Sequence, residues 1–326
     1  MNTIRLDIAP SVLQWVSSSY ADKIDEGLTQ KIQIWFSKEQ KPTLTDIENL
    51  SQKTKVPFGY FFLNEPPVED LPILEYRTID SMEIANPSRE LIDTISYIEN
   101  VQSYMRDFRK DNGYDKNEVV GVGKNLSTQE LTVRVRKILD IDKEWYKSTK
   151  NELFNFLRAK FEENGVIVTK NGIAGKSTKR ALNYKEFRAF TMIDDYAPLI
   201  FINSTDTNNG QVFSLLHEFV HILLGESNFH NARVSGTKTD KRNEIMCNAI
   251  TGEILVPHDI FITKWEQEQN IGRLASHFCC SEIVIARKAL DNGYIKQDRY
   301  DEICKEVIRK AEEIRLNKDK DSGGDY

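Results

Sequence analysis

The sequence has few of the features that mark secreted, membrane-spanning or nucleic-acid-binding chains. Only four of its 326 residues are cysteine, and none forms a Cys-x-x-Cys pair, which is typical of reduced thiols in a cytoplasmic protein. The N-terminus lacks an apolar signal core, and no window reaches about 18 consecutive apolar residues, so we expect no membrane association. The net charge of −6 gives no global signature of nucleic-acid binding.

What the sequence does contain is a polar motif inside an apolar segment, residues 211–225. The motif is His217-Glu218-x-x-His221. On a helix the two histidines project from one face, one turn apart, and two imidazoles at that separation can bind one Zn²⁺. Glu218 then lies beside the metal, where it can take a proton from a metal-bound water whose pKa falls to roughly 7. This is the pattern of zinc peptidases.

The surroundings of the motif favour a metal site over an accidental match. Most other positions from 212 to 224 are apolar, which predicts a helix buried nearly all round. Burying two histidines and a glutamate without partners is unfavourable, and a bound metal offsets that cost. Gly225 supplies a C-terminal stop for the helix.

The third ligand is expected on the next apolar segment, residues 242–257. This segment offers Glu244 and Glu253, although a glutamate in a helix is ordinarily a solvated surface charge. We favour Glu244 because Cys247 and Asn248 follow about one turn later and make that face polar for a buried helix. Two histidines on expected loops are weaker candidates: His230 and His258.

The residues before the motif predict a helix and a small sheet. The helix covers residues 153–161, and the three strands cover residues 165–169, 188–193 and 198–203, the last two joined as a hairpin. This order predicts an α+β fold, mostly helical, with a small mixed sheet packed on the metal helix as in zincins. We expect the last strand to be the outer one, whose free backbone groups can pair with an extended substrate.

Composition and turn signals divide the chain into five regions. In order, we expect a helical module at 1–64, a linker and helical region at 65–150 that opens with a Pro-rich acidic stretch at 65–79, a metallopeptidase core at 151–265, a helical segment at 266–317 and a disordered tail at 318–326. Thr43 with Asp46, and Ser127 with Glu130, predict capping boxes that open two helices. Gly121-Val-Gly123 lacks the third glycine and the preceding strand of a nucleotide-binding loop, so we expect only a turn there.

Several of these segments together resemble the ImmA/IrrE family of metallo-endopeptidases. The resemblance covers most of residues 10–290 and is found at Phe187–Phe190, Asp195–Asn203, Phe213–His221, Glu244 with Cys247 and Asn248, Glu253–Pro257 and, more weakly, Leu274–Ser281. It implies a gluzincin-like zinc endopeptidase in which His217, His221 and Glu244 bind Zn²⁺ and Glu218 is catalytic. It also implies a protein substrate, because members of this family cut regulatory proteins, often repressors of mobile elements or stress genes, and others accompany toxin–antitoxin loci.

The N-terminal half resembles the Xre-type helix-turn-helix module that is often fused to such peptidases. The resemblance rests on Trp35, on the Pro-Thr-Leu that begins at Pro42, and on Val56–Phe62. Only about ten residues separate Tyr20 from Gln30, where an Xre-type domain needs two short helices, so the recognition helix looks eroded. We therefore expect this module to recognise protein more than DNA.

Two functions follow from the sequence. The first is a cytoplasmic zinc endopeptidase that cleaves a specific regulator, repressor or antitoxin-like partner with Glu218 as general base. The second is a non-proteolytic transcriptional regulator or antitoxin that uses the zinc fold to bind a partner. The intact Glu218 favours the enzyme, since metal binding alone does not require it. Longer relatives continue past a Gly-Gly segment like Gly323-Gly324, so we also expect a C-terminal portion to be absent.

Overall fold

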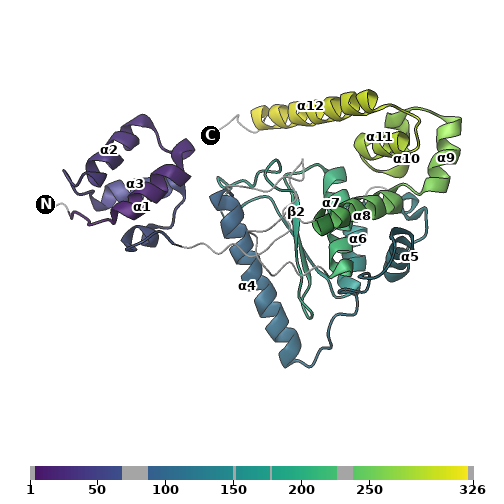
Figure 1. The fold of residues 1–326 in the computed structure, drawn as a ribbon, viewed down its shortest axis with the longest axis horizontal. Coiled ribbons are helices and arrows are strands. Elements are labelled where there is room, and N and C mark those ends of the chain that lie inside the picture. The colour runs from purple at the N-terminus through teal and green to yellow at the C-terminus, as the bar shows by residue number, and fades with distance from the viewer. Residues whose placement is uncertain (1–3, 68–86, 150–151, 177, 226–237, 322–326) are drawn as a thin grey trace. The chain divides into compact units, whose positions relative to one another are not determined.

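The structure is a computed structural model that describes residues 4–67, 87–149, 152–176, 178–225 and 238–321. The chain divides into two compact units, one formed by the residues up to 71 with 85–93, the other by the remaining residues. Each unit is described by itself below, with the elements labelled as in Figure 1. Most of the Pro-rich stretch at 65–79 lies outside the described residues. His230 and residues 322–326 lie outside them entirely.

The N-terminal unit is a helical bundle around its own apolar core. Its elements are α1 (Pro10–Ser19), the 3₁₀ turn η1 (Ala21–Lys23), α2 (Glu26–Phe36), α3 (Leu44–Thr54) and the 3₁₀ turn η2 (Phe58–Phe62). The predicted capping box is confirmed, since Thr43 Oγ1 accepts from Asp46 N at 3.1 Å and Asp46 bonds back to Thr43 N. Between α1 and α3 the chain forms one 3₁₀ turn and one α-helix. The unit is therefore compatible with an Xre-like origin.

The second unit contains the predicted α+β architecture. Its elements are α4 (Arg89–Asp111, whose first residues group with the N-terminal unit), α5 (Thr128–Leu139), η3 (Trp145–Lys147), α6 (Leu153–Glu163), β1 (Ile167–Asn171), β2 (Ala189–Met192), β3 (Leu199–Asn203), α7 (Asn208–Leu224), α8 (Lys238–Leu255), α9 (His258–Gln267), α10 (Ile271–Phe278), α11 (Glu282–Asp291) and α12 (Gln297–Asp321). The three predicted strands and the capping box at Ser127 are confirmed.

The strand order in the sheet is β1-β3-β2, so the expectation that the last strand is the outer one is wrong. β3 lies in the middle, parallel to β1 and antiparallel to β2, which makes β2 an outer strand. The hairpin between β2 and β3 is short, whereas β1 and β3, which pair in parallel, are separated in the sequence by β2. β3 is buried on every residue, as expected for a strand covered on both sides, but the outer strand β2 is too, so burial alone does not determine the order.

Hydrogen bonds at the ends of β3 show where its backbone groups point. Ile167 N donates to Pro198 O and Asn203 N donates to Arg188 O, both at 2.9 Å. Backbone groups alternate between the two sides of a strand, so Ile200 faces β1 and Phe201 faces β2. By the same alternation, the N–H and C=O of Ala189 and Thr191 point away from β3, toward the outer edge of β2. The two residues are buried, 0% and 5% exposed.

Helices cover both faces of this sheet. Figure 1 shows α4 on one side of β2 and α6 and α7 on the other. Gln102 of α4 ties its helix to the hairpin by donating to Met192 O at 2.9 Å and to Ala197 O at 3.0 Å. The sheet is thus enclosed, and α7 lies directly against β2 and β3.

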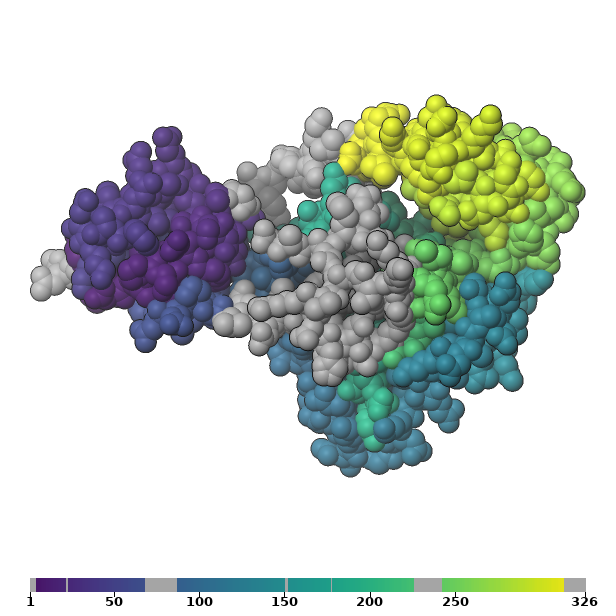
Figure 2. Space-filling model, in the orientation of Figure 1, coloured from purple at the N-terminus to yellow at the C-terminus, as the bar shows by residue number. Residues whose placement is uncertain are grey.

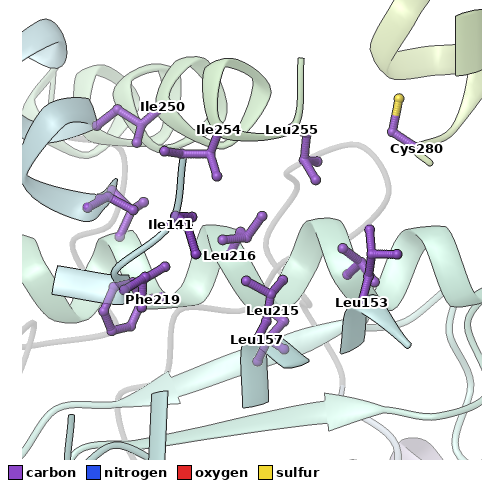
Figure 3. Packing of buried hydrophobic residues seen from close by; sticks show 14 of the residues in the cluster. Ile141, Leu153, Leu157, Leu215, Leu216, Phe219, Ile250, Ile254, Leu255 and Cys280 are labelled. Carbon is purple, nitrogen blue, oxygen red and sulfur yellow. The ribbon is translucent and has the colours of Figure 1, made fainter. Parts of the chain in front are cut away.

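The main core of the unit lies between α6, α7 and α8. Leu215, Leu216 and Phe219 of α7 are buried among side chains of the two neighbouring helices, as Figure 3 shows: Leu153, Leu157, Ile250, Ile254 and Leu255. Each fully buried side chain of this size contributes about 1.5–3 kcal/mol relative to exposure. The apolar contacts hold α7 and α8 together, which fixes the residues that lie between them.

The C-terminal helices continue the unit beyond the core. α12 packs against α11 and lies on the surface as the yellow ridge in Figure 2. It extends to Asp321, so residues 318–321 are helical where we expected disorder. Among the described residues no single helix is long and apolar enough to span a membrane, and the pair that passes together, Arg242–Leu255 and His258–Gln267, is bent by 59°.

Candidate metal centre

The helix that holds the predicted motif is capped at both ends. At its start, Thr207 Oγ1 accepts from Gly210 N at 3.1 Å. At its end, Gly225 adopts the left-handed conformation with φ of 59°, as the glycine stop predicted. A Cβ at Gly225 would lie 2.5 Å from Gly121 Cα, so no other residue fits without a shift.

Gly121-Val-Gly123 provides the cap for the last carbonyl groups of α7. Gly121 N donates to Ile222 O at 3.0 Å, and Gly123 N donates to Leu223 O at 2.7 Å. The last four carbonyls of a helix have no partner within the helix, so these bonds satisfy two of them. The turn that the sequence excluded as a nucleotide loop is therefore a helix cap, formed by residues about a hundred positions earlier in the chain.

His217 and His221 lie on the inner face of α7, 0% and 2% exposed. Their Nε2 atoms are 3.0 Å apart. Glu244 enters from α8: its Oε1 lies 3.1 Å from His221 Nε2, and its Oε2 lies 3.4 Å from His217 Nε2. The structure thus brings together the two histidines and the glutamate that the sequence favoured.

The spacing of these atoms fits a zinc ion. In a tetrahedral site with bonds of about 2.1 Å, neighbouring ligand atoms lie about 3.4 Å apart. The three separations above are close to that value, and the three ligand atoms lie within 4.8 Å of one another. Glu244 Oε2 is buried and makes no hydrogen bond to any described residue. Two imidazoles and one carboxylate are also the donor set of catalytic zinc sites that keep one position open.

The electrostatics of Glu244 suit a metal ligand. Burial raises the pKa of its carboxyl, but the close contacts and charge of His217 and His221 outweigh burial, so the pKa lies well below its usual range. The carboxyl is therefore ionised at neutral pH, and the ionised form is the one that binds a metal.

The other candidate ligands lie elsewhere or outside the described residues. Glu253 bonds to Lys288 and accepts from His258 N at 2.9 Å, so its carboxylate is engaged at the end of α8. His258 is exposed at the first position of α9. His230 is outside the described residues. The two described alternatives, Glu253 and His258, therefore do not join the histidine pair.

Glu218 is 1% exposed and makes a contact that sequence analysis did not anticipate. Thr191 Oγ1 on β2 donates to Glu218 Oε2 at 2.7 Å. The strand pattern around Thr191 was visible in the sequence, but which strand would lie beside α7 was not. The contact therefore depends on the strand order, not on the local pattern.

Cys247 lies behind the histidine pair. Its Sγ is 3.6 Å from His221 Nδ1, and the residue is 0% exposed. A partner on the second ring nitrogen orients a metal-binding histidine and fixes which nitrogen faces the metal. The polar face noted in the sequence around Glu244 is accordingly part of the support of the histidine pair.

Comparison with protein families agrees with this arrangement. Residues 166–290 match the Peptidase_M78 family, described as the IrrE N-terminal-like domain. The match begins at β1 and ends in α11, so it includes the sheet, α7 and α8. No curated protein matches the chain in a separate comparison. Residues 166–290 are therefore similar to the IrrE N-terminal-like domain of Peptidase_M78, a metallopeptidase family.

Proposed function

We propose that this chain is a zinc-dependent endopeptidase, with His217, His221 and Glu244 as metal ligands and Glu218 as the general base. The observation that supports it most is the convergence of three ligand atoms from α7 and α8 with Glu218 on the same helix turn. Metallopeptidase membership supports a zinc ion and a protein substrate.

The chemistry needs a polarised peptide bond and a place for the moving proton. Bound zinc would polarise the scissile carbonyl and make water more acidic. Glu218 would accept the proton of the attacking water and pass it to the nitrogen of the leaving amine. Glu218 is 1% exposed, so bulk water has little access to its carboxylate.

The outer strand β2 is the element on which we place the substrate backbone. The main-chain groups of Ala189 and Thr191 point to its outer edge, and no described residue forms a backbone hydrogen bond with them there. Because both residues are buried, a peptide that pairs there has to displace the atoms that cover this edge. An extended peptide can add to such an edge through main-chain hydrogen bonds. β2 thus takes the role that we first assigned to β3, whose groups are used by the two neighbouring strands.

The natural substrate is proposed to be a specific regulatory protein in the cytoplasm, such as a repressor or antitoxin-like partner. Residues 4–67 hold seven Lys or Arg and eight Asp or Glu, a net charge of 7 − 8 = −1. That balance is unlike the basic surface of a DNA reader and favours docking of a protein. We therefore propose the N-terminal unit, as a separate domain, for substrate selection.

Glu218→Gln tests the catalytic assignment. The variant keeps size and hydrogen-bonding groups but removes the base, so we expect one zinc per chain, an unchanged fold and cleavage slower by at least about 10²-fold. The assay is co-expression with products of neighbouring genes, followed by mass spectrometry of the purified partner. Glu162→Gln, an exposed glutamate on α6, is the matched control and should cleave normally. Equal cleavage by Glu218→Gln and wild type would refute the mechanism.

Proline substitutions test the placement of substrate on β2. Ala189→Pro removes an outward N–H and should weaken peptide binding while zinc is kept. Ile200→Pro and Phe201→Pro remove N–H groups that serve the sheet, so both should reduce the free energy of unfolding. Normal cleavage by folded, zinc-loaded Ala189→Pro would show that substrate backbone does not pair at that N–H.

A further inference from the structure

We propose that Thr191 is a positioning residue that orients Glu218 and ties this carboxylate to the strand on which substrate is held. The inference rests on the proposed peptidase function and deepens it. It assigns to one residue of β2 two tasks, one for its side chain and one for its main chain.

The side chain of Thr191 reaches the general base directly. Its Oγ1 donates to Glu218 Oε2 at 2.7 Å and lies 3.3 Å from the Glu218 carbonyl oxygen. A hydroxyl has one proton to donate, and the shorter distance together with the charge of the carboxylate assigns that proton to Oε2. The bond fixes one oxygen of the carboxylate, and with it the plane of the group.

Burial makes this bond selective for a hydroxyl. Thr191 is 5% exposed and Glu218 is 1% exposed, so water does not readily replace the donor. The branched side chain of threonine also has few rotamers, which holds Oγ1 in place. Loss of the hydroxyl removes a charge-assisted bond from a buried carboxylate, whereas serine keeps the donor with more rotational freedom.

The strand register explains why this residue faces α7. Thr191 pairs with Ile200 of β3, and Ile200 belongs to the core shared with α7. Successive residues of a strand point to opposite faces, so Phe190 and Met192 point to the other side. A slip of one residue would place an aromatic ring against Glu218, and the register therefore determines the chemistry at the base.

The main chain of the same residue faces the outer edge of β2. Arg188 bonds to Asn203 across the hairpin, and counting along the strand puts the N–H and C=O of Thr191 outward. A peptide that pairs with β2 there contacts the residue that holds Glu218. Alignment of the substrate backbone and orientation of the base thus depend on one residue.

Thr191→Val and Thr191→Ser separate the two tasks. Valine keeps the shape and the main chain but lacks the hydroxyl, so we expect kcat to fall about 10-fold while KM changes less than about twofold. Serine should stay within about threefold of wild type on kcat, because it keeps the donor. Thr132→Val is the matched control: its buried hydroxyl donates to Thr128 O at 2.7 Å within α5, far in sequence from the site.

A binding measurement gives a readout that does not require cleavage. The probe is an extended peptide ending in a hydroxamic acid, whose acidic group needs a base beside the metal. Calorimetry on zinc-loaded protein should give a Kd about 10-fold weaker for Thr191→Val, with Thr191→Ser and Thr132→Val close to wild type. In a Glu218→Gln background the same Thr191→Val change should have no further effect, because the two residues act as one unit. Internally quenched peptides of mixed sequence supply kcat and KM.

Several results would overturn the inference. For the hydroxamate peptide they are a Kd that is unchanged in Thr191→Val, a Kd as weak in Thr191→Ser as in Thr191→Val, or no binding to the wild type. An equal loss of affinity from Thr191→Val in the wild-type and Glu218→Gln backgrounds would also overturn it. So would loss of zinc from Thr191→Val. Failure of the proposed function looks different. If wild type cleaves no peptide and no partner but the hydroxamate pattern holds, Thr191 positions Glu218 in a protein that is not a peptidase.

Discussion

The two units of the chain bury polar groups in opposite ways. Among the described residues 4–67, the buried polar side chain is Thr54, whose hydroxyl donates to Leu50 O at 2.7 Å inside its own helix. In the second unit, three ionisable side chains are buried on the single helix α7: His217, Glu218 and His221. Among the described side chains of residues 4–67 no carboxylate is buried, whereas the second unit contains buried nitrogen and oxygen atoms that a cation would stabilise. We therefore expect metal dependence to be confined to the second unit.

The location of the ion pairs is a second feature of the N-terminal residues. Among residues 4–67 the described ion pairs are at the surface: Lys31 with Asp46 at 3.0 Å, Lys41 with Asp7 at 2.8 Å, and Lys53 with Asp25. Exposed pairs contribute roughly 0–1 kcal/mol each. The surface charge of this unit can thus change with little loss of stability, as suits a surface that selects partners. In the second unit, by contrast, a change of charge at His217, His221 or Glu244 should reduce metal binding.

Removal of the metal should have the largest effect and should separate the units. A ligand present at about a thousand times its Kd contributes roughly 4 kcal/mol, and about 1 kcal/mol shifts the Tm of a domain this size by roughly 2–4 °C. A chelator should therefore lower the Tm of the second unit by about 10 °C and leave the first transition in place. Scanning calorimetry with and without added Zn²⁺ measures both. Equal shifts of the two transitions would show that metal dependence is not confined to the second unit.

Cys247→Ala should have an intermediate effect, chiefly on metal affinity. It removes the partner of His221 Nδ1, and loss of such a partner weakens metal binding by about 10–100-fold. Competition with a chromogenic chelator measures the affinity. Cys304→Ala on α12, also a free thiol, is the control and should bind zinc as wild type does. Matching affinities for the two variants would show that Cys247 does not support the site.

Helix caps should give the smallest effect, and one that reports each unit separately. Thr43→Ala and Ser127→Ala each remove a capping box, which should cost about 1 kcal/mol of unfolding free energy. Thr43→Ala should lower only the first thermal transition, and Ser127→Ala only the second. Zinc content should be unchanged in both. A single transition that responds alike to both variants would mean that the units do not unfold independently.

Features set by local sequence could be predicted. The capping boxes, the Gly225 stop and the histidine pair depend on residues within a few positions of one another, and the structure has each of them. Glu244 was favoured over Glu253 because the polar face of its helix could be counted from the sequence. Glu244 does lie beside the two histidines, so a polar face on a buried helix predicted a contact with the preceding helix in the sequence.

Features set by long-range packing could not be predicted. The place of β3 in the middle of the sheet depends on a parallel pairing with β1 that no local pattern determines. The cap of α7 by Gly121 and Gly123 and the bond from Thr191 to Glu218 both join distant segments. Each becomes visible only when the strand order and helix packing are known, because the residues alone are compatible with an ordinary turn and an ordinary strand.

The central claim is that His217, His221 and Glu244 hold one zinc ion. Elemental analysis of purified wild type, Glu244→Ala and Glu253→Ala tests it most directly, because the two glutamates lie on the same helix and only one faces the histidines. We predict one zinc per chain in wild type and in Glu253→Ala, and loss of most zinc from Glu244→Ala. Full retention of zinc by Glu244→Ala, with loss from Glu253→Ala, would contradict this account.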